Sequence, residues 1–166
     1  MAISTTQSIW RSGGGDQTRT AYCGSGVMAA QFYISGASAA GTSAKVSSTA
    51  GAPAVVLPAG AVVLEIQANC AATGGTTPTF DMGFTVYGTS TATNTGLISA
   101  AVATTGKLVI NQASATAGAN MGTTMSTTKL VTITGGGTSG DAPTGGSITG
   151  TILYFVVDPL LGQQND

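Results

Sequence analysis

The side chains best suited to acid–base chemistry in this sequence are its six carboxylates: Asp16, Glu65, Asp81, Asp141, Asp158 and Asp166. Two carboxylates about 5 to 10 Å apart in a cleft can hydrolyse a glycosidic bond. Glu65 and Asp81 are the best such pair, since both fall on polar faces of predicted strands that follow each other along the chain. No aromatic platform for a sugar ring accompanies them. We therefore favour a solvated strand face, or charges that prevent edge pairing, over a glycan hydrolase.

Other kinds of catalytic or ligand site lack essential parts. The chain has no histidine, so its many hydroxyls have no imidazole base and a metal has no imidazole ligand. The glycine runs at 13–15 and 135–137 are not followed by the Lys-Ser/Thr pair and helix of a phosphate loop. Asp141 stands alone in its loop, which argues against a calcium site. We expect no enzyme activity, no cofactor and no metal.

Charge is sparse along the whole chain. Five basic and six acidic residues among 166 give a formal net charge of -1. The five cations form no cluster in sequence, so no surface is predicted to neutralise the phosphates of a nucleic acid. No run of about 18 apolar residues is present to cross a membrane as a helix, and residues 1–16 lack the basic flank and apolar stretch of a secretion signal. We expect neither nucleic acid nor membrane as a partner.

Alternation of apolar and polar residues predicts an all-β domain. Strands are expected at 27–35, 61–70, 79–88, 107–112, 129–134 and 147–159, with a short edge strand near Lys45 and Val46. Residues 96–103 fit a short helix or a strand, and both stay open. Loops rich in glycine, threonine and proline join these segments, which is typical of a sandwich or barrel of roughly seven to nine strands.

Two predicted strands indicate how the core is built. In 61–70, alternation places Leu64, Ile66, Ala68 and Cys70 on one buried face. In 147–159 both faces are apolar, which predicts a central strand covered on both sides or a strand at a subunit interface. Each buried alanine contributes far less than the roughly 1.5 to 3 kcal/mol of a buried Val, Leu or Phe, so this alanine-rich core predicts further burial between subunits.

Residues 1–26 are predicted to form an extended N-terminal arm, and residues 27–166 the β-sandwich domain. The arm is polar and rich in glycine, and it holds the one tryptophan of the chain. Because Trp and Arg are enriched where proteins dock, the contact candidates are Ile9, Trp10, Arg11 and Arg19. Packing of Trp10 onto its own domain is an equal alternative.

The two cysteines, Cys23 and Cys70, either form a disulfide or remain two buried thiols. Nothing in the sequence marks the chain as secreted, and disulfides are rare in cytosolic proteins. Buried free cysteines behave as small apolar residues. We favour two free thiols and leave the pairing open.

Residues 53–84, PAVVLPAGAVVLEIQANCAATGGTTPTFDMGF, resemble small virion proteins of tailed bacteriophages. In those proteins a Leu-Pro-Ala-Gly turn precedes an alternating strand, a Gly/Thr loop and a strand with Asp-x-Gly. Residues 148–159, ITGTILYFVVDP, are similar to the closing strand of the same proteins. The resemblance covers about 53–88 and 147–159. It implies a jelly-roll-like β-sandwich of about eight strands that forms a homotrimer on the outside of the phage head as a decoration, or cement, protein.

Composition and resemblance together predict a capsid decoration protein. It would be made in the host cytoplasm and lie on the capsid exterior of the virion, with the major capsid protein and further copies of itself as partners. A tail-fibre or receptor-binding module is the alternative, with the loop at 134–146 as its recognition surface. A glycan hydrolase that uses Glu65 and Asp81 is a second, less favoured alternative, and a major coat subunit is a third.

Overall fold

The computed structural model describes residues 26–36, 44–45, 54–74, 76–87, 92–104, 106–136 and 141–157. These residues form nine β-strands: β1 (Met28–Ser35), β2 (Ala44–Lys45), β3 (Val56–Leu57), β4 (Ala61–Thr73), β5 (Thr79–Val86), β6 (Ala92–Val102), β7 (Gly106–Asn111), β8 (Lys129–Gly135) and β9 (Gly145–Val156). Within the described ranges, no helix is long and apolar enough to cross a membrane.

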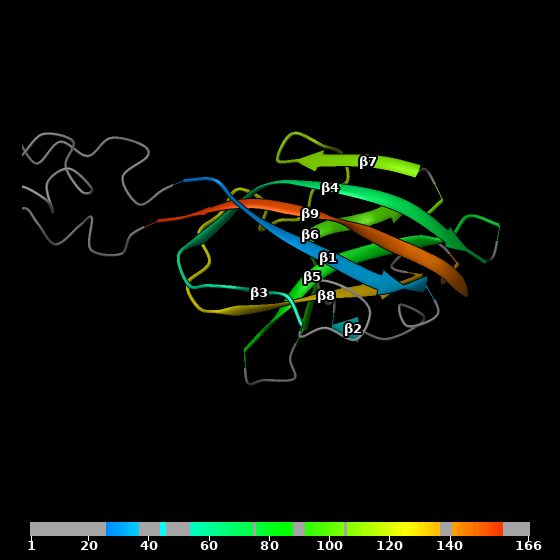
Figure 1. Cartoon of the computed structure of the whole chain (residues 1–166), viewed down its shortest axis with the longest axis horizontal. Helices are drawn as coiled ribbons and strands as arrows, with labels where there is room; N and C mark the ends of the chain where they lie inside the picture. Colours follow the sequence, from blue (N-terminus) through cyan, green and yellow to red (C-terminus); the bar gives the residue numbers. More distant parts are fainter. Residues whose placement is uncertain are drawn as a thin grey trace, which may run out of the picture.

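The strands form two antiparallel sheets that pack face to face (Figure 1). Sheet A has the order β1-β9-β4-β7, and sheet B has the order β2-β8-β5-β6 with β3 also paired to β8. The pairing is nested along the chain, since β5 pairs with β6, β4 with β7, β2 and β3 with β8, and β1 with β9. A ribbon of nested antiparallel pairs that wraps into two sheets is a jelly roll. The predicted all-β, jelly-roll-like sandwich is confirmed.

The core lies between the sheets and consists of alternate, inward-facing side chains. In β1, Phe32 and Ile34 are buried, as the alternation of 27–35 predicts. Gly150 of β9 lies opposite Phe32, and a Cβ there would come within 2.8 Å of the Phe32 ring and would also collide with the backbone oxygen of Gln67. Glycine at position 150 therefore makes room for the largest side chain of this part of the core.

Strand β4 carries a bulge between Val63 and Glu65. The bulge adds one residue, so the side chains before it change faces relative to a regular strand. Val63 is fully buried and Leu64 is 39% exposed, which is the reverse of the predicted alternation. Beyond the bulge, Ile66 and the next two inward positions are buried as predicted. The expectation of a buried Leu64 is wrong because strict alternation takes no account of an inserted residue.

The open choice for 96–103 is decided in favour of a strand, since Ala92–Val102 forms β6, with an irregularity at Ala100. Strand β2 includes Lys45, where a short edge strand was expected, whereas β3 was not predicted. The remaining predicted strands all occur, with ends that differ by a few residues.

The segment between β7 and β8 closes one side of the sandwich. The backbone N–H of Gly118 donates to the oxygen of Leu97 at 2.8 Å, and the N–H of Met125 donates to the oxygen of Ala61 at 2.8 Å. The segment thus joins β6 of sheet B to β4 of sheet A. Met121 and Met125 are buried in the core, and flexible methionine side chains suit such an irregular gap.

The predicted arm, residues 1–26, lies outside the described residues except for Gly26. Its extended form and the boundary between the arm and the domain at 27–166 stay predictions. Of the predicted surface loop at 134–146, residues 134–136 and 141–146 are described.

Candidate functional site

The candidate catalytic pair, Glu65 and Asp81, is divided between the two sheets. Glu65 lies on β4 in sheet A and Asp81 on β5 in sheet B, and these strands are not hydrogen-bonded neighbours. Each carboxylate alternates with inward-facing core residues, so each lies on the outer side of its own sheet. Because packed sheets lie about 10 Å apart, the two carboxylates do not share a cleft. The two strands follow each other along the chain but are not neighbours in a sheet.

Asp81 serves the fold. Its side chain is only 3% exposed, and its Oδ1 accepts a hydrogen bond from the backbone N–H of Ala100 at 2.6 Å. Ala100 has a φ of +53°, at an irregularity where β6 carries an extra residue opposite β5. A carboxylate oxygen is a strong acceptor, and it holds this left-handed residue in place. Asp81 is therefore not the solvated or edge-protecting charge that we expected.

Glu65 is half-buried on the outer face of sheet A, and its Oε1 accepts a hydrogen bond from Nε2 of Gln67 at 2.7 Å. The two side chains point the same way because they are two residues apart on one strand. Glu65 is thus a surface group with an amide partner.

Ser126 and Lys129 have the Ser-x-x-Lys spacing of serine enzymes that use a lysine. The structure does not assemble that pair. Lys129 begins strand β8, and its Nζ lies 5.0 Å from the centroid of the Phe84 ring, which is a cation–π contact. Ser126 is exposed in the preceding turn. The spacing therefore produces a packing contact rather than a nucleophile with its base.

Asp141 holds the loop between β4 and β5. Its Oδ2 accepts a hydrogen bond from the N–H of Thr76 at 2.8 Å, and its backbone oxygen accepts one from the N–H of Thr79 at 3.1 Å. Among the described residues, no three Cys, Asp or Glu side chains come together as candidate metal ligands. The role that Asp141 shows is to join two loops.

Cys70 lies on the inner face of β4, and its free thiol is buried in the core. Burial raises the pKa of the Cys70 thiol from 9.0 to about 11, because the thiolate would lose its hydration. Cys23 lies outside the described residues, so its pairing with Cys70 stays open. A buried thiol with a raised pKa is a poor nucleophile at neutral pH.

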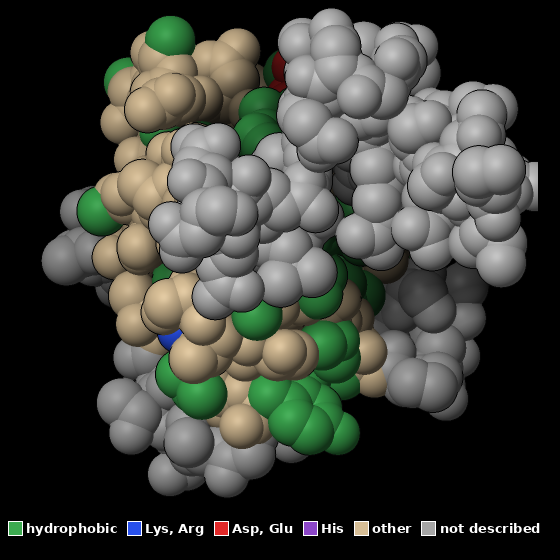
Figure 2. Space-filling model, turned by 90° about the vertical axis from the view of Figure 1, so that its left-hand side faces the viewer, with side chains coloured by type: hydrophobic (Ala, Val, Ile, Leu, Met, Phe, Trp, Pro, Cys, Tyr) green, Lys and Arg blue, Asp and Glu red, His purple; other side chains and the backbone are tan. Residues whose placement is uncertain are grey.

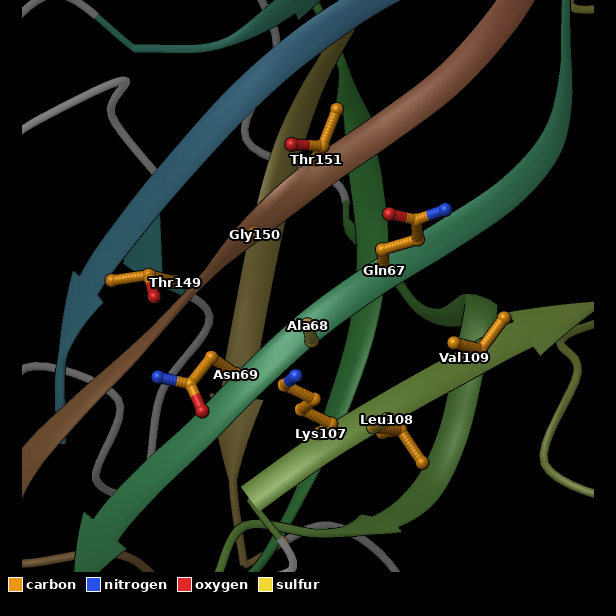
Figure 3. Close-up of a pocket in the computed structure, with 9 residues that line it drawn as sticks. All are labelled: Gln67, Ala68, Asn69, Lys107, Leu108, Val109, Thr149, Gly150 and Thr151. Atoms are coloured by element: carbon orange, nitrogen blue, oxygen red, sulfur yellow. The ribbon is translucent and has the colours of Figure 1, made fainter.

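Mostly polar side chains, with Val109 among them, form two rows across the outer face of sheet A (Figure 3). One row is Thr151, Gln67 and Val109, and the next is Thr149, Asn69 and Lys107. Between them lies a shallow hollow of about 370 Å³, which we call the polar hollow. Its lining offers hydroxyls, amides and one ammonium group, and it includes no carboxylate. Leu108 and Val109 add apolar area to the same lining, so the hollow presents polar and apolar groups side by side.

The other end of the same outer face is apolar. Val27 is 62% exposed, Leu64 is 39% exposed, and Leu153 and Phe155 are half-buried. We call these four residues the apolar strip. The bulge in β4 places Leu64 beside Glu65, which pairs with Leu153, and Phe155 pairs with Val62 one step further along. Figure 2 views the end of the molecule that lies on the left in Figure 1, and its described surface shows hydrophobic side chains with little blue or red.

The outer face of sheet B is covered by contrast. Thr79, Asp81 and Thr85 of β5 and Thr132 of β8 are all buried. A Cβ on Gly83 would collide with the backbone of Thr93 and Asn94, so that backbone lies directly against the strand. Sheet A is therefore the sheet whose outer face is exposed, and it carries both the polar hollow and the apolar strip.

No protein-family model and no curated protein matches this sequence. Among solved structures, a chain in the capsid of Ralstonia phage GP4 matches with a TM-score of 0.54 and 21% sequence identity, over 80% of this chain and 85% of that chain. The chain shares its fold with a phage capsid chain. A chain of the cyanophage Pam1 capsid asymmetric unit gives a TM-score of 0.46 at 20% identity, over 81% of this chain and 87% of that one. At 21% identity, the likeness to the GP4 chain establishes the fold and not the activity.

The predicted contact residues Ile9, Trp10, Arg11 and Arg19 lie outside the described residues, and their role stays a prediction. The apolar strip was visible only in part from the sequence. Two apolar faces at 147–159 indicated that Leu153 and Phe155 face something other than the core. The exposure of Leu64 depends on the bulge and had no signal in the pattern.

Proposed function

We propose that this protein is a structural component of a bacteriophage virion that decorates the outside of the head. In this role it stabilises the lattice of the major capsid protein, which is its partner, and it assembles as a homotrimer. The proposal places it on the capsid exterior after synthesis in the host cytoplasm. It requires no cofactor and no catalytic step.

The observation that carries the proposal is the likeness to a chain in the capsid of Ralstonia phage GP4. The match includes 85% of that chain and 80% of this one, so the two chains have nearly the same extent and one jelly roll accounts for most of each. A single jelly roll is also a recurrent architecture of viral capsid proteins. The likeness thus supports a role as a separate small subunit of a capsid.

The use of the few charged groups agrees with a structural role. Asp81 and Asp141 hold backbone groups, and Lys129 packs on an aromatic ring. Glu65 and Asp81, the pair required for the hydrolase alternative, lie on different sheets. Asp81, Asp141 and Lys129 stabilise the fold, and the described residues do not assemble these charged side chains into a catalytic site.

The core supports assembly with further copies. Five alanines are among the buried core residues, and they bury less apolar area than larger side chains would. Contacts between copies add burial that stabilises each domain by mass action. The homotrimer is the form of assembly that we propose.

The arm supplies the grip in this proposal. Trp10 and Arg11 are the kinds of side chain that anchor protein interfaces, with Ile9 beside them and Arg19 further along. Replacement of Trp10 by alanine is expected to weaken binding to the head without changing the melting temperature of the domain.

The proposal is tested with purified protein and heads assembled without it. We expect the protein to elute as a trimer, to co-sediment with the heads and to appear on their outer surface in particle images. A monomer that fails to bind heads contradicts the proposal. Localisation on the tail favours a receptor-binding module. If the protein itself occupies every position of the shell lattice and no other coat protein is present, it is a major coat subunit.

A further inference from the structure

We propose that the apolar strip, Val27, Leu64, Leu153 and Phe155, is the surface by which the folded domain lies on a subunit of the capsid shell. This inference rests on the proposed function and names the face that makes the contact. The occupant is a shell subunit that presents an apolar, uncharged patch to the strip.

The strip is built by the ends of β9 and β1 and by the bulge within β4. Leu153 and Phe155 are outward-facing positions of β9, because Ile152 before them is fully buried and Tyr154 between them packs against the core. The bulge turns Leu64 outward on β4, where its neighbour Glu65 pairs with Leu153. Val27 precedes β1, whose Ala29 pairs with Leu153 from the other side. Three neighbouring strands of sheet A thus bring these side chains to one area.

The same strand shows what an exposed face of this sheet normally carries. The outward positions of β9 before the strip are Ser147, Thr149 and Thr151, which match the polar hollow. The pattern changes to Leu153 and Phe155 only at the end of the strand. Exposed apolar side chains gathered in one area mark interaction sites more often than scattered ones do.

The chain outside the described residues points to the shell as the occupant. Met28 pairs with Tyr154, so the first and last described segments lie side by side at the strip. Twenty-five residues precede Gly26, and Arg11 lies fifteen residues before it. The chain from Arg11 to Gly26 spans at most about 50 Å when fully extended. An arm that grips the shell therefore keeps this end of the domain close to the same shell.

The charge around the strip limits the chemistry of its partner. Among the residues that the structure describes, Glu65 is the charged residue beside it, and Gln67 already donates a hydrogen bond to that carboxylate. An apolar partner surface without a concentration of charge fits here, since burying an unpaired charge is costly. A partner with a basic patch would bind best to clustered carboxylates, and the described residues of sheet A contain no such cluster.

The test replaces the strip without disturbing the strand. In the double variant Leu153→Thr/Phe155→Thr, threonine continues the pattern of Thr149 and Thr151 and keeps a high β-propensity. The matched control is Asn69→Ala/Thr149→Ala, a cross-strand pair in the polar hollow on the same face, which leaves Gln67 and its bond to Glu65 in place. Both variants and the wild type are compared for melting temperature, mass in solution and co-sedimentation with heads assembled without the protein.

We expect the strip variant to remain a folded trimer and to bind heads about tenfold more weakly or worse, while the control binds within about twofold of the wild type. Unchanged head binding by the strip variant overturns the inference and leaves the proposed function intact. Dissociation of the trimer also overturns it, because the strip then joins copies of this chain. If the wild type itself does not bind heads, the proposed function fails and the inference fails with it. Should the double variant unfold, Leu64→Thr alone is tested by the same criteria.

Discussion

The backbone N–H of Ala100 donates a hydrogen bond to Oδ1 of Asp81 at 2.6 Å. This contact crosses from β6 to β5 where the register between the two strands shifts, and Ala100 is the one described non-glycine residue with a positive φ. Asp81, a candidate acid from the sequence, thus helps to fix the backbone geometry of sheet B. Its carboxylate supplies the acceptor that the irregular strand leaves unmatched.

Replacement of Asp81 by alanine is expected to lower the free energy of unfolding by about 2 kcal/mol, because a hydrogen bond to a carboxylate is lost and the Ala100 N–H loses its partner. Asp81→Asn keeps an oxygen acceptor and should cost less. Urea denaturation measures both values. The control Glu65→Ala, on the outer face of sheet A, should change stability by no more than about 0.5 kcal/mol. Equal effects at positions 65 and 81 would contradict the structural role of Asp81.

Three glycines are expected to respond to alanine in a graded way. Gly83→Ala would place a Cβ against the backbone of Thr93 and Asn94 and should cost about 3 kcal/mol or more. Gly106 has open space around it but a φ of +75°, so its substitution should cost about 1 to 2 kcal/mol.

Gly26→Ala is the control of this series, since Gly26 has nothing within 4 Å of an added Cβ. It should be neutral to within about 0.5 kcal/mol. Thermal unfolding ranks the three variants. A stable Gly83→Ala protein would show that β6 does not lie against β5 as described.

Stability at alkaline pH is expected to depend on Cys70. Its thiol pKa is raised from 9.0 to about 11 in the folded protein, so between these values the unfolded chain releases a proton that the folded chain keeps. The free energy of unfolding therefore falls as pH rises through this window, and below it Cys70 has no effect on the slope.

The measurement compares urea denaturation at several pH values for two proteins, both of which carry Cys23→Ala. One retains Cys70 and the other carries Cys70→Ala, so the difference between their pH slopes reports Cys70 alone. We expect the steeper decline in the protein that retains Cys70. Parallel slopes would mean that the thiol is hydrated in the folded state.

Binding to heads is expected to change little with salt. Exposed charge pairs weaken as the Debye length falls from about 10 Å at 0.1 M to about 3 Å at 1 M salt, but this chain has few charges to screen. Co-sedimentation across that range should give affinities within about threefold of one another. A steep loss of binding at high salt would assign the grip to Arg11 and Arg19 instead of apolar contacts.

Much of the site depended on information that is not local in sequence. The alternation of 27–35 predicted β1, because successive residues of a strand face the core and the outside in turn, and the apolar run of 147–159 predicted β9. Strand pairing joins segments that are far apart in the sequence. The residues around Glu65 and Asp81 therefore gave no sign that β4 and β5 belong to different sheets. The segment that contains Met121 and Met125 has no strand pattern, and its place was set by backbone bonds to distant strands.

The sequence by itself determined that this protein is an all-β domain with sparse charge, no imidazole and an apolar closing strand, since composition and period-two alternation are properties of the chain alone. Tertiary structure decided which faces remain open. The bulge at Leu64 turned that side chain out to join Leu153 and Phe155, and the backbone of β6 covered the outer side of Gly83. Both outcomes arise from how strands register and stack, which is a matter of contacts between segments far apart in the chain.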